Sequence, residues 1–498
     1  MPRTTLALTS FVSGEFSAKM DGRTDFEKYT SGVKTMENFL VHPQGAATRR
    51  VGTQHIAEVK DSTKKTRLIP FEFSTTQTYI LEFGDQYMRV YKDKGQVLSG
   101  GSPFEISTPF LEAELFDIKF AQSADVMYLC HPNHDVRKLS RTGHTSWTLA
   151  TVSFTGSPSL PISGADNRPS CVSFFEQRLV FANTNNNPQT LWFSKAGDYE
   201  NFTTGTNADD AMIYTIASNQ VNAIQYLKAV RTLIVGTSGG EFTVSADGTD
   251  ASITPTNVTI KRQSSFGSSG VDAIPAGNAV LFLQKAKRKI RELAYNFDSD
   301  GYVAPDLTIL NDTVTKSGVN QMIFQQEPDS IIWCVRDDGV LAGLTYQRSE
   351  NVVAWHRHIF GGAFGSGNAV CESAASISGT LTEDELWVIV KRTINGATKR
   401  YVECFSDFDF DETDATDFKF LDSHLNYSGS ATTTLSGLSH LEGQTVSILA
   451  DGSVHANKTV SSGAITLDRS VTKACVGLAY DSVLQTMRIE GGAAEGTS

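Results

Sequence analysis

The stretch that decides the fold is residues 73–91, FSTTQTYILEFGDQYMRVY, in which two apolar runs flank a polar turn. The first run is Tyr79-Ile80-Leu81-Glu82-Phe83, the second is Met88-Arg89-Val90-Tyr91, and Gly84-Asp85 lies between them. Aromatic and β-branched side chains favour strands, and Gly beside a polar residue suits the backbone of a hairpin turn. The stretch therefore predicts a β-hairpin.

The same pattern returns about every 50 residues along the chain. Each copy begins with an apolar anchor, and neighbouring anchors lie 47 to 54 residues apart. The anchors are Phe73, Phe120, Phe174, Tyr226, Ile274, Phe324 and Ile377. Hairpins at this period are typical of four-stranded propeller blades, whereas helical solenoids need apolar residues every 3.6 positions. We predict an all-β protein with a β-propeller-like repeat domain of about six to eight blades.

Four regions follow from where the repeat begins and ends. Residues 1–70 form an N-terminal docking segment, and residues 71–406 form the repeat domain. Residues 407–420 are rich in Asp and Glu and read as an acidic linker. Residues 421–498 hold short strands with Gly turns and predict a small C-terminal β-barrel.

The N-terminal segment differs from the rest of the chain in charge and in periodicity. It has 11 basic and 7 acidic residues, although the whole chain has a net charge of −12. Apolar residues at spacings of three or four from Asp25 to Leu40 predict one helix. Arg23, Arg49 and Arg50 lie near Gly and Pro turns, and we expect them to dock an acidic partner. The alternative is that Arg49 and Arg50 cap local backbone carbonyls.

Several short motifs resemble known catalytic or metal-binding patterns, and none supports an enzyme. Residues 236–240 match Gly-x-Ser-x-Gly, but a strand follows where the nucleophile elbow needs a helix. Residues 296–301 resemble the start of a calcium loop, but the twelfth position is Leu307 instead of Glu. His356 and His358 share one face of a strand without a nearby carboxylate in the sequence. We predict no catalytic residue, no cofactor and no metal.

The cysteines and the hydropathy pattern further narrow the class of protein. The six cysteines are scattered without a Cys-x-x-Cys pair, which favours buried free thiols. Cys475 alternates with Val471 and Gly477 along a predicted strand, and burial there would raise its pKa. No run of 18 apolar residues is present, so we predict no membrane span. An acidic chain of this kind also argues against sequence-specific DNA binding.

Longer stretches resemble a known family. Residues 13–17, 22–29 and 37–50 resemble the opening of bacteriophage tail proteins of the tail nozzle, or tail tubular protein B, type. The likeness continues over residues 191–202, 302–308 and 351–358, which lie within the repeats. Residues 421–480 are similar to a small module named after the first catalytic cysteine half-domain of ubiquitin-activating enzymes. No adenylation domain accompanies that module, so ubiquitin chemistry is not expected.

The resemblance implies a structural virion protein. It would form the tail nozzle of a short-tailed bacteriophage, extend the DNA-ejection channel below the adaptor and portal, and help retain the genome. The implied partners are five further copies in a homo-hexamer, the adaptor or portal, tail fibres, and double-stranded DNA in transit. The protein would be made in the host cytoplasm and reside in the virion tail. The alternatives are a receptor- or carbohydrate-binding tail propeller, and a propeller hydrolase with convergent carboxylates.

Overall fold

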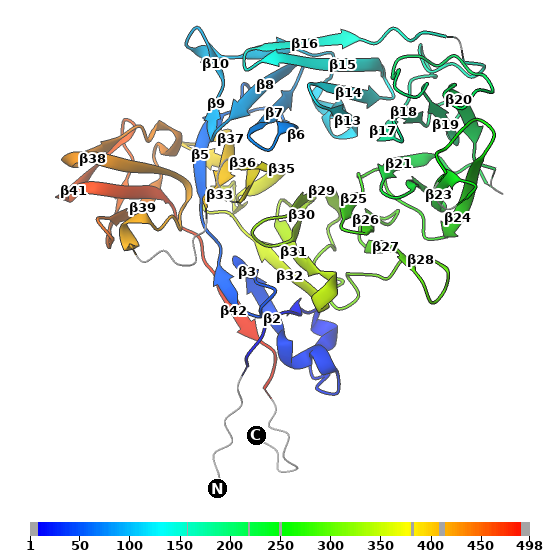
Figure 1. Ribbon diagram of the computed structural model, residues 1–498. Helices are drawn as coiled ribbons and strands as arrows, with labels where there is room; N and C mark the ends of the chain where they lie inside the picture. Colours follow the sequence, from blue (N-terminus) through cyan, green and yellow to red (C-terminus); the bar gives the residue numbers. More distant parts are fainter. Residues whose placement is uncertain are drawn as a thin grey trace.

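The fold is a β-propeller with seven four-stranded blades and a β module attached to its side (Figure 1). The computed structural model describes residues 8–156, 158–217, 220–248, 251–379, 383–407 and 414–489. Within each of the first five blades the strands are antiparallel and follow one another outward from the axis. Residues 408–413 of the predicted acidic linker lie outside the described residues.

Blades 1 to 5 are each built from one continuous stretch of chain. Blade 1 consists of β6 (Arg67–Ser74), β7 (Gln77–Gly84), β8 (Tyr87–Lys92) and β12 (Glu105–Ser107), with the short strands β9 (Gly95–Gln96), β10 (Leu98–Ser99) and β11 (Ser102–Pro103) beside it. Blade 2 consists of β13 (Lys119–Ser123), β14 (Val126–His131), β15 (His134–Gly143) and β16 (Ser146–Thr151). Blade 3 consists of β17 (Cys171–Phe175), β18 (Arg178–Ala182), β19 (Thr190–Phe193) and β20 (Met212–Thr215). Blade 4 consists of β21 (Ile224–Ala229), β22 (Leu233–Thr237), β23 (Gly240–Ala246) and β24 (Val258–Ser264). Blade 5 consists of β25 (Ile274–Ala276), β26 (Ala279–Leu283), β27 (Ile290–Asn296) and β28 (Gly301–Val303).

Blades 6 and 7 draw on strands from distant parts of the sequence. Blade 6 consists of β29 (Val319–Gln325), β30 (Ile331–Arg336), β31 (Leu341–Gln347) and β32 (Val352–His358), and is extended by β1 (Gly14–Glu15), β2 (Gly32–Glu37) and β42 (Val483–Thr486). Blade 7 consists of β35 (Val370–Ser378), β36 (Asp384–Ile394), β37 (Ala397–Phe405) and β5 (Thr53–Glu58). Because β5 precedes blade 1 in the chain, its pairing with β37 closes the ring.

The anchors predicted from the repeat occupy equivalent places in the seven blades. Each lies on the innermost strand of its blade, from Phe73 on β6 to Ile377 on β35. Neighbouring blades pack through apolar side chains on their facing surfaces, as Leu81 of blade 1 and Leu129 of blade 2 do. The prediction of an all-β propeller is confirmed, and the described residues form seven blades.

The predicted helix from Asp25 to Leu40 is wrong. The chain forms the short 3₁₀ helix η2 (Glu27–Ser31) and then strand β2. A register shift between Val33 and Thr35 in the pairing of β2 with β42 lets Val33 and Met36 both become buried, at a spacing that resembles a helix. The pairing of β2 with β1, β42 and β32 therefore outweighs the helix-like spacing of its apolar residues.

The C-terminal module has a core of its own and is joined to blade 7. Its strands are β38 (Asp422–Ser436), β39 (Thr445–Ala450), β40 (Ser453–Thr459) and β41 (Ala464–Leu478). β38 contacts β5 through a single parallel bridge between His424 and Gln54, so the sheet of blade 7 continues into the module.

The remaining elements are short. They are β3 (Phe39–Val41), β4 (Ala47–Arg49), β33 (Ala363–Phe364), β34 (Gly367–Asn368), η1 (Ala18–Met20), η3 (Glu112–Asp117), η4 (Arg348–Glu350), η5 (Ala415–Asp417) and η6 (Ser439–Leu441). Across the described ranges, the search for a helix long and apolar enough to cross a membrane finds none.

Candidate functional site

A cavity of about 550 Å³ lies on the propeller axis. It is lined by residues of the innermost strands of the blades, which surround the centre of the ring in Figure 1. A volume of this size falls within the range of ligand-binding sites. The axial cavity is therefore the candidate functional site.

Charged side chains reach this cavity from several blades. The cations that line it are Arg67, Lys119, Lys228 and Lys287, and the anions are Asp117 and Asp272. Among the described residues, the lining thus holds more positive than negative groups, although the chain as a whole has a net charge of −12. A cavity with this balance favours an anionic ligand over a cationic one.

Asp272 is the carboxylate at the centre of this charge group. Lys119 Nζ donates to Asp272 Oδ1 at 2.8 Å and also donates to the carbonyl oxygen of Gly270. Burial raises the pKa of Asp272, but Lys119, Lys228 and Arg67 outweigh that effect and hold its pKa below the ordinary value. The carboxylate therefore stays ionised and neutralises part of the positive charge.

Lys228 projects from β21 into the same cavity. Burial lowers the pKa of Lys228, Asp272 opposes that shift, and Lys119 adds to it. In the part of the chain that the structure describes, Asp272 has its ion pair with Lys119 and none with Lys228. Lys228 Nζ is therefore placed to donate hydrogen bonds to a ligand in the cavity.

Arg67 is the most buried of the three cations near Asp272, with 6% of its surface exposed. Its Nη1 donates to the carbonyl oxygens of Leu115 at 2.8 Å and Ile118 at 2.7 Å. Nothing among the described residues accepts a hydrogen bond from Nε, which is buried. The guanidinium thus ties blade 1 to the start of blade 2 and leaves one donor without an acceptor.

The rest of the lining is apolar side chains and strand edges. The apolar side chains that line the cavity beside the polar ones include Phe120, Phe174 and Ile323. Each innermost strand of blades 1 to 5 pairs with one neighbour only, so its other edge faces the axis. An edge of this kind presents backbone donors and acceptors that an extended chain can use.

The arginines predicted to dock a partner have different surroundings. Arg23 is exposed and pairs with Asp25 at 2.8 Å. Arg49 is exposed and donates to the Tyr480 carbonyl oxygen at 3.1 Å. Arg50 is completely buried, and its guanidinium is fully engaged inside the protein. The three are not brought together into one surface group, and their docking role stays a prediction.

The other motifs singled out in the sequence form a turn or lie in the protein core. Residues 236–240 form the hairpin turn between β22 and β23, as expected. His356 and His358 are buried on one face of β32, with Nδ1 and Nε2 2.6 Å apart. The cysteines are buried and free, and burial raises the pKa of Cys475 to about 12. None of these motifs contributes to the axial cavity.

Sequence reasoning missed the cations of the cavity, although the repeat carried a signal for them. Lys119 directly precedes the anchor Phe120, and Lys228 lies two positions after the anchor Tyr226. A charged residue beside an anchor of a propeller repeat lies on an innermost strand and therefore close to the axis. The anchor register would have placed these two lysines near each other.

The comparisons with known proteins bear on the fold. No family model matches the chain, and no curated protein matches it. The chain is similar to the β-propeller domain of Swd1 (Cps50) of Myceliophteria thermophila, at 9% identity over 71% of this chain and 100% of that one, with a TM-score of 0.42. It is similar to the Pan2 WD40 domain of Neurospora crassa, at 9% identity over 73% and 97%, with a TM-score of 0.39. It is also similar to the RRP9 WD40 repeats, at 8% identity over 72% and 98%, with a TM-score of 0.44.

These findings correct the function expected from the sequence. The solved structures named above are WD40 and other β-propeller domains and not phage tail proteins, so the predicted tail-nozzle function is wrong. The propeller itself stands on the strand pairing. The family resemblance, the hexamer and the location in a virion tail stay predictions.

Proposed function

We propose that this chain is a non-enzymatic binding scaffold that holds an acidic peptide segment in the axial cavity of its propeller. The observation that carries the proposal is the pair of cations, Lys228 and Arg67, beside an Asp272 that Lys119 already engages. An acidic side chain entering the cavity supplies the carboxylate that Lys228 lacks. Charge-assisted hydrogen bonds of this kind are among the stronger polar contacts in proteins.

A peptide fits the lining better than a small anion does. The cavity alternates cations with apolar side chains such as Phe120 and Phe174. The axial edges of the innermost strands add backbone donors and acceptors. A segment that carries both carboxylates and apolar side chains uses all three features, whereas an inorganic anion uses the cations alone.

The test measures the binding of fluorescein-labelled hexaglutamate by fluorescence anisotropy, with labelled hexalysine as the probe of opposite charge. We expect the purified full-length chain to bind hexaglutamate and not hexalysine. Lys228→Gln should weaken binding about tenfold, which corresponds to about 1.4 kcal/mol. Excess unlabelled inorganic phosphate should not displace the peptide.

The matched control is Lys261→Gln, because Lys261 is exposed on β24, far from the axis. This variant loses the same charge and should bind hexaglutamate as the unmodified chain does. Equal binding by the Lys228→Gln and unmodified chains would show that the cavity is not the binding site. Displacement by phosphate would show a small-anion site instead.

A further inference from the structure

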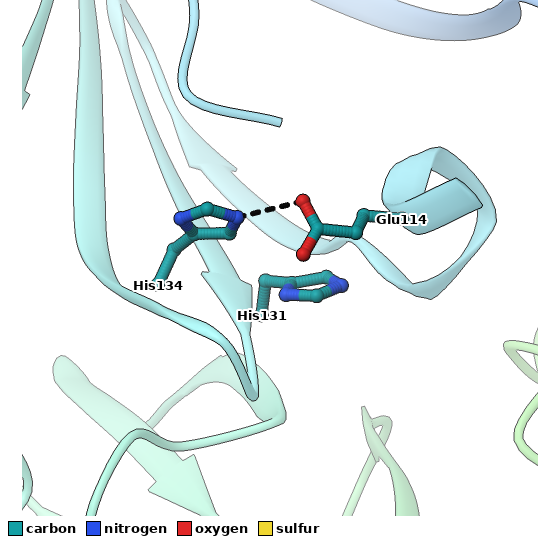
Figure 2. Close-up of side chains that lie close together, drawn as sticks. All are labelled: Glu114, His131 and His134. Atoms are coloured by element: carbon teal, nitrogen blue, oxygen red, sulfur yellow. Dashed lines mark hydrogen bonds and ion pairs between the residues drawn. The ribbon is translucent and has the colours of Figure 1, made fainter. Parts of the chain in front are cut away.

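Three side chains with metal-ligating atoms meet where the connection between blades 1 and 2 passes the β14–β15 turn. Glu114 lies on η3, which connects blade 1 to blade 2, and His131 and His134 flank the turn between β14 and β15. One ligand atom of each residue lies within 4.8 Å of the others. Figure 2 shows the Glu114 carboxylate facing the His134 ring, with the His131 ring next to them.

The hydrogen bonds around Glu114 fix the position of its carboxylate. His134 Nε2 lies 2.8 Å from Glu114 Oε2, and the Leu111 amide donates to the same oxygen at 2.9 Å. Asn133 Nδ2 donates to Oε1 at 3.0 Å. These contacts hold the carboxylate in one orientation, so the group supplies an oxygen ligand in a fixed position.

His131 supplies the observation that points to a bound ion. It is 1% exposed, and its Nε2 is buried with no hydrogen-bond partner among the described residues. Its other ring nitrogen, Nδ1, accepts a hydrogen bond from the Asn133 backbone amide at 3.1 Å. A buried polar atom without a partner calls for an explanation, and a cation beside an ionised carboxylate provides one.

We propose that Glu114, His131 and His134 form a Zn²⁺ site. Two imidazole nitrogens and one carboxylate oxygen are a ligand set that zinc accepts, and three protein ligands leave a fourth position open. Glu114 and His134 retain 14% and 20% of their side-chain exposure, so an ion can enter from solvent. The assignment rests on this cluster alone and is independent of the peptide proposed for the axial cavity.

Zinc binding requires changes in two hydrogen bonds. The ion takes the place of the hydrogen between His134 Nε2 and Glu114 Oε2, and that hydrogen moves to His134 Nδ1. The second change is at His131, which would bind the ion through Nε2. Without the ion, the backbone N–H of Asn133 donates to His131 Nδ1 at 3.1 Å, and the ring hydrogen is therefore on Nε2. When Nε2 binds the ion, that hydrogen moves to Nδ1, and the Asn133 amide has to turn away from the ring. The Asn133 backbone amide lies in the turn between β14 and β15. The proton count of the neutral ring is unchanged.

The test uses the full chain stripped of metal with a chelator. Zn²⁺ binding is measured by competition with a chromophoric chelator, and Co²⁺ is added as a spectroscopic probe of the ligand geometry. We expect His131→Ala and His134→Ala each to lose one equivalent of Zn²⁺ and the matching Co²⁺ absorption bands. Their affinity at this site should fall about 100-fold or more, because even outer-shell changes cost 10- to 100-fold.

The matched control is Asn133→Ala. It removes the hydrogen bond from Asn133 Nδ2 to Glu114 Oε1 but leaves all three ligands and the backbone amide in place. This variant should still bind the same number of zinc ions. If the histidine variants fold, as judged by circular dichroism, and bind as much Zn²⁺ as the unmodified chain, the three residues are a structural contact and not a metal site.

Discussion

Arg50 and Asp422 form a bidentate ion pair in which both side chains are completely buried. Arg50 Nη1 donates to Asp422 Oδ1 at 2.8 Å and Nη2 donates to Oδ2 at 2.7 Å, across 372 positions of sequence. Arg50 Nε donates to Asn38 Oδ1 at 2.9 Å, and the guanidinium lies 3.7 Å from the centre of the Tyr480 ring. The pair therefore joins the N-terminal segment to the first strand of the C-terminal module.

Breaking this pair should be costly. Arg50→Ala leaves the Asp422 carboxylate buried without its cation, and such a loss typically destabilises a protein by about 3–5 kcal/mol. We expect a clear fall in the midpoint of urea unfolding. Arg49→Ala is the matched control, because Arg49 is exposed and its change should cost less than about 1 kcal/mol. Equal midpoints for the two variants would contradict the structural role of Arg50.

The N-terminal segment also meets the C-terminal module at a place where only glycine fits. A Cβ on Gly52 would lie 1.8 Å from the carbonyl oxygen of Leu421, which is backbone and cannot move aside as a side chain can. Gly52→Ala should therefore destabilise the chain by about 1–3 kcal/mol. On Gly143 the nearest atom to an added Cβ is Ser146 Cβ at 3.7 Å, so Gly143→Ala should be nearly neutral.

The two glycine variants are compared by thermal unfolding under identical conditions. Limited proteolysis should also cut the Gly52→Ala chain near the junction with the module, if the contact with Leu421 opens first. A Gly52→Ala chain as stable as the Gly143→Ala chain would show that the two segments are not in close contact.

The blades could be predicted from sequence because each is nearly self-contained. An anchor such as Phe120, the hairpin after it and the next strand all lie within about 50 residues, so local patterns report the whole blade. The strands that complete blades 6 and 7 could not be found in this way. β5 pairs with β37, whose residues lie more than 300 positions away, and nothing in the local pattern of β5 encodes that partner.

The candidate sites were harder to predict from sequence than the blades, because their residues come together only in the tertiary structure. Lys119 and Asp272 are 153 positions apart, and only the closed ring brings them to hydrogen-bonding distance. The His131–His134 pair is visible in sequence as two histidines around a turn, but Glu114 comes from the connection between two blades. A search for metal ligands within one motif therefore misses the third ligand.

The thiols should be unreactive in the folded chain. The six cysteines are free and buried, and burial raises the pKa of Cys475 and Cys334 to about 12. Thiolate is the reactive form, so the native protein at pH 8 should show almost no reaction with Ellman's reagent. After unfolding in guanidinium chloride, six thiols should react. Rapid labelling of Cys475 in the native chain would contradict its burial.

The junction between blade 7 and the C-terminal module should weaken in acid because of His424. Its Nε2 lies 2.8 Å from Ser406 Oγ, and its Nδ1 is buried with no partner among the described residues. Burial and the nearby Lys419 lower its pKa to about 4, although Asp422 opposes the shift. The folded state therefore resists protonation of this ring over a range in which the unfolded chain accepts the proton.

The direction of the pH effect follows from the two pKa values. At pH 7.5, a full unit above the ordinary pKa of 6.5, the ring is almost entirely neutral in both states and makes almost no difference. As the pH falls from 6.5 towards 4, the unfolded state binds the proton first, and the free energy of unfolding decreases by about 2 kcal/mol by pH 5. Unfolding curves at pH 7.5 and pH 5.0 should show this loss, and His424→Gln should reduce it. An unchanged pH dependence in a folded His424→Gln chain would show that other groups, such as the buried His356 and His358, carry the effect.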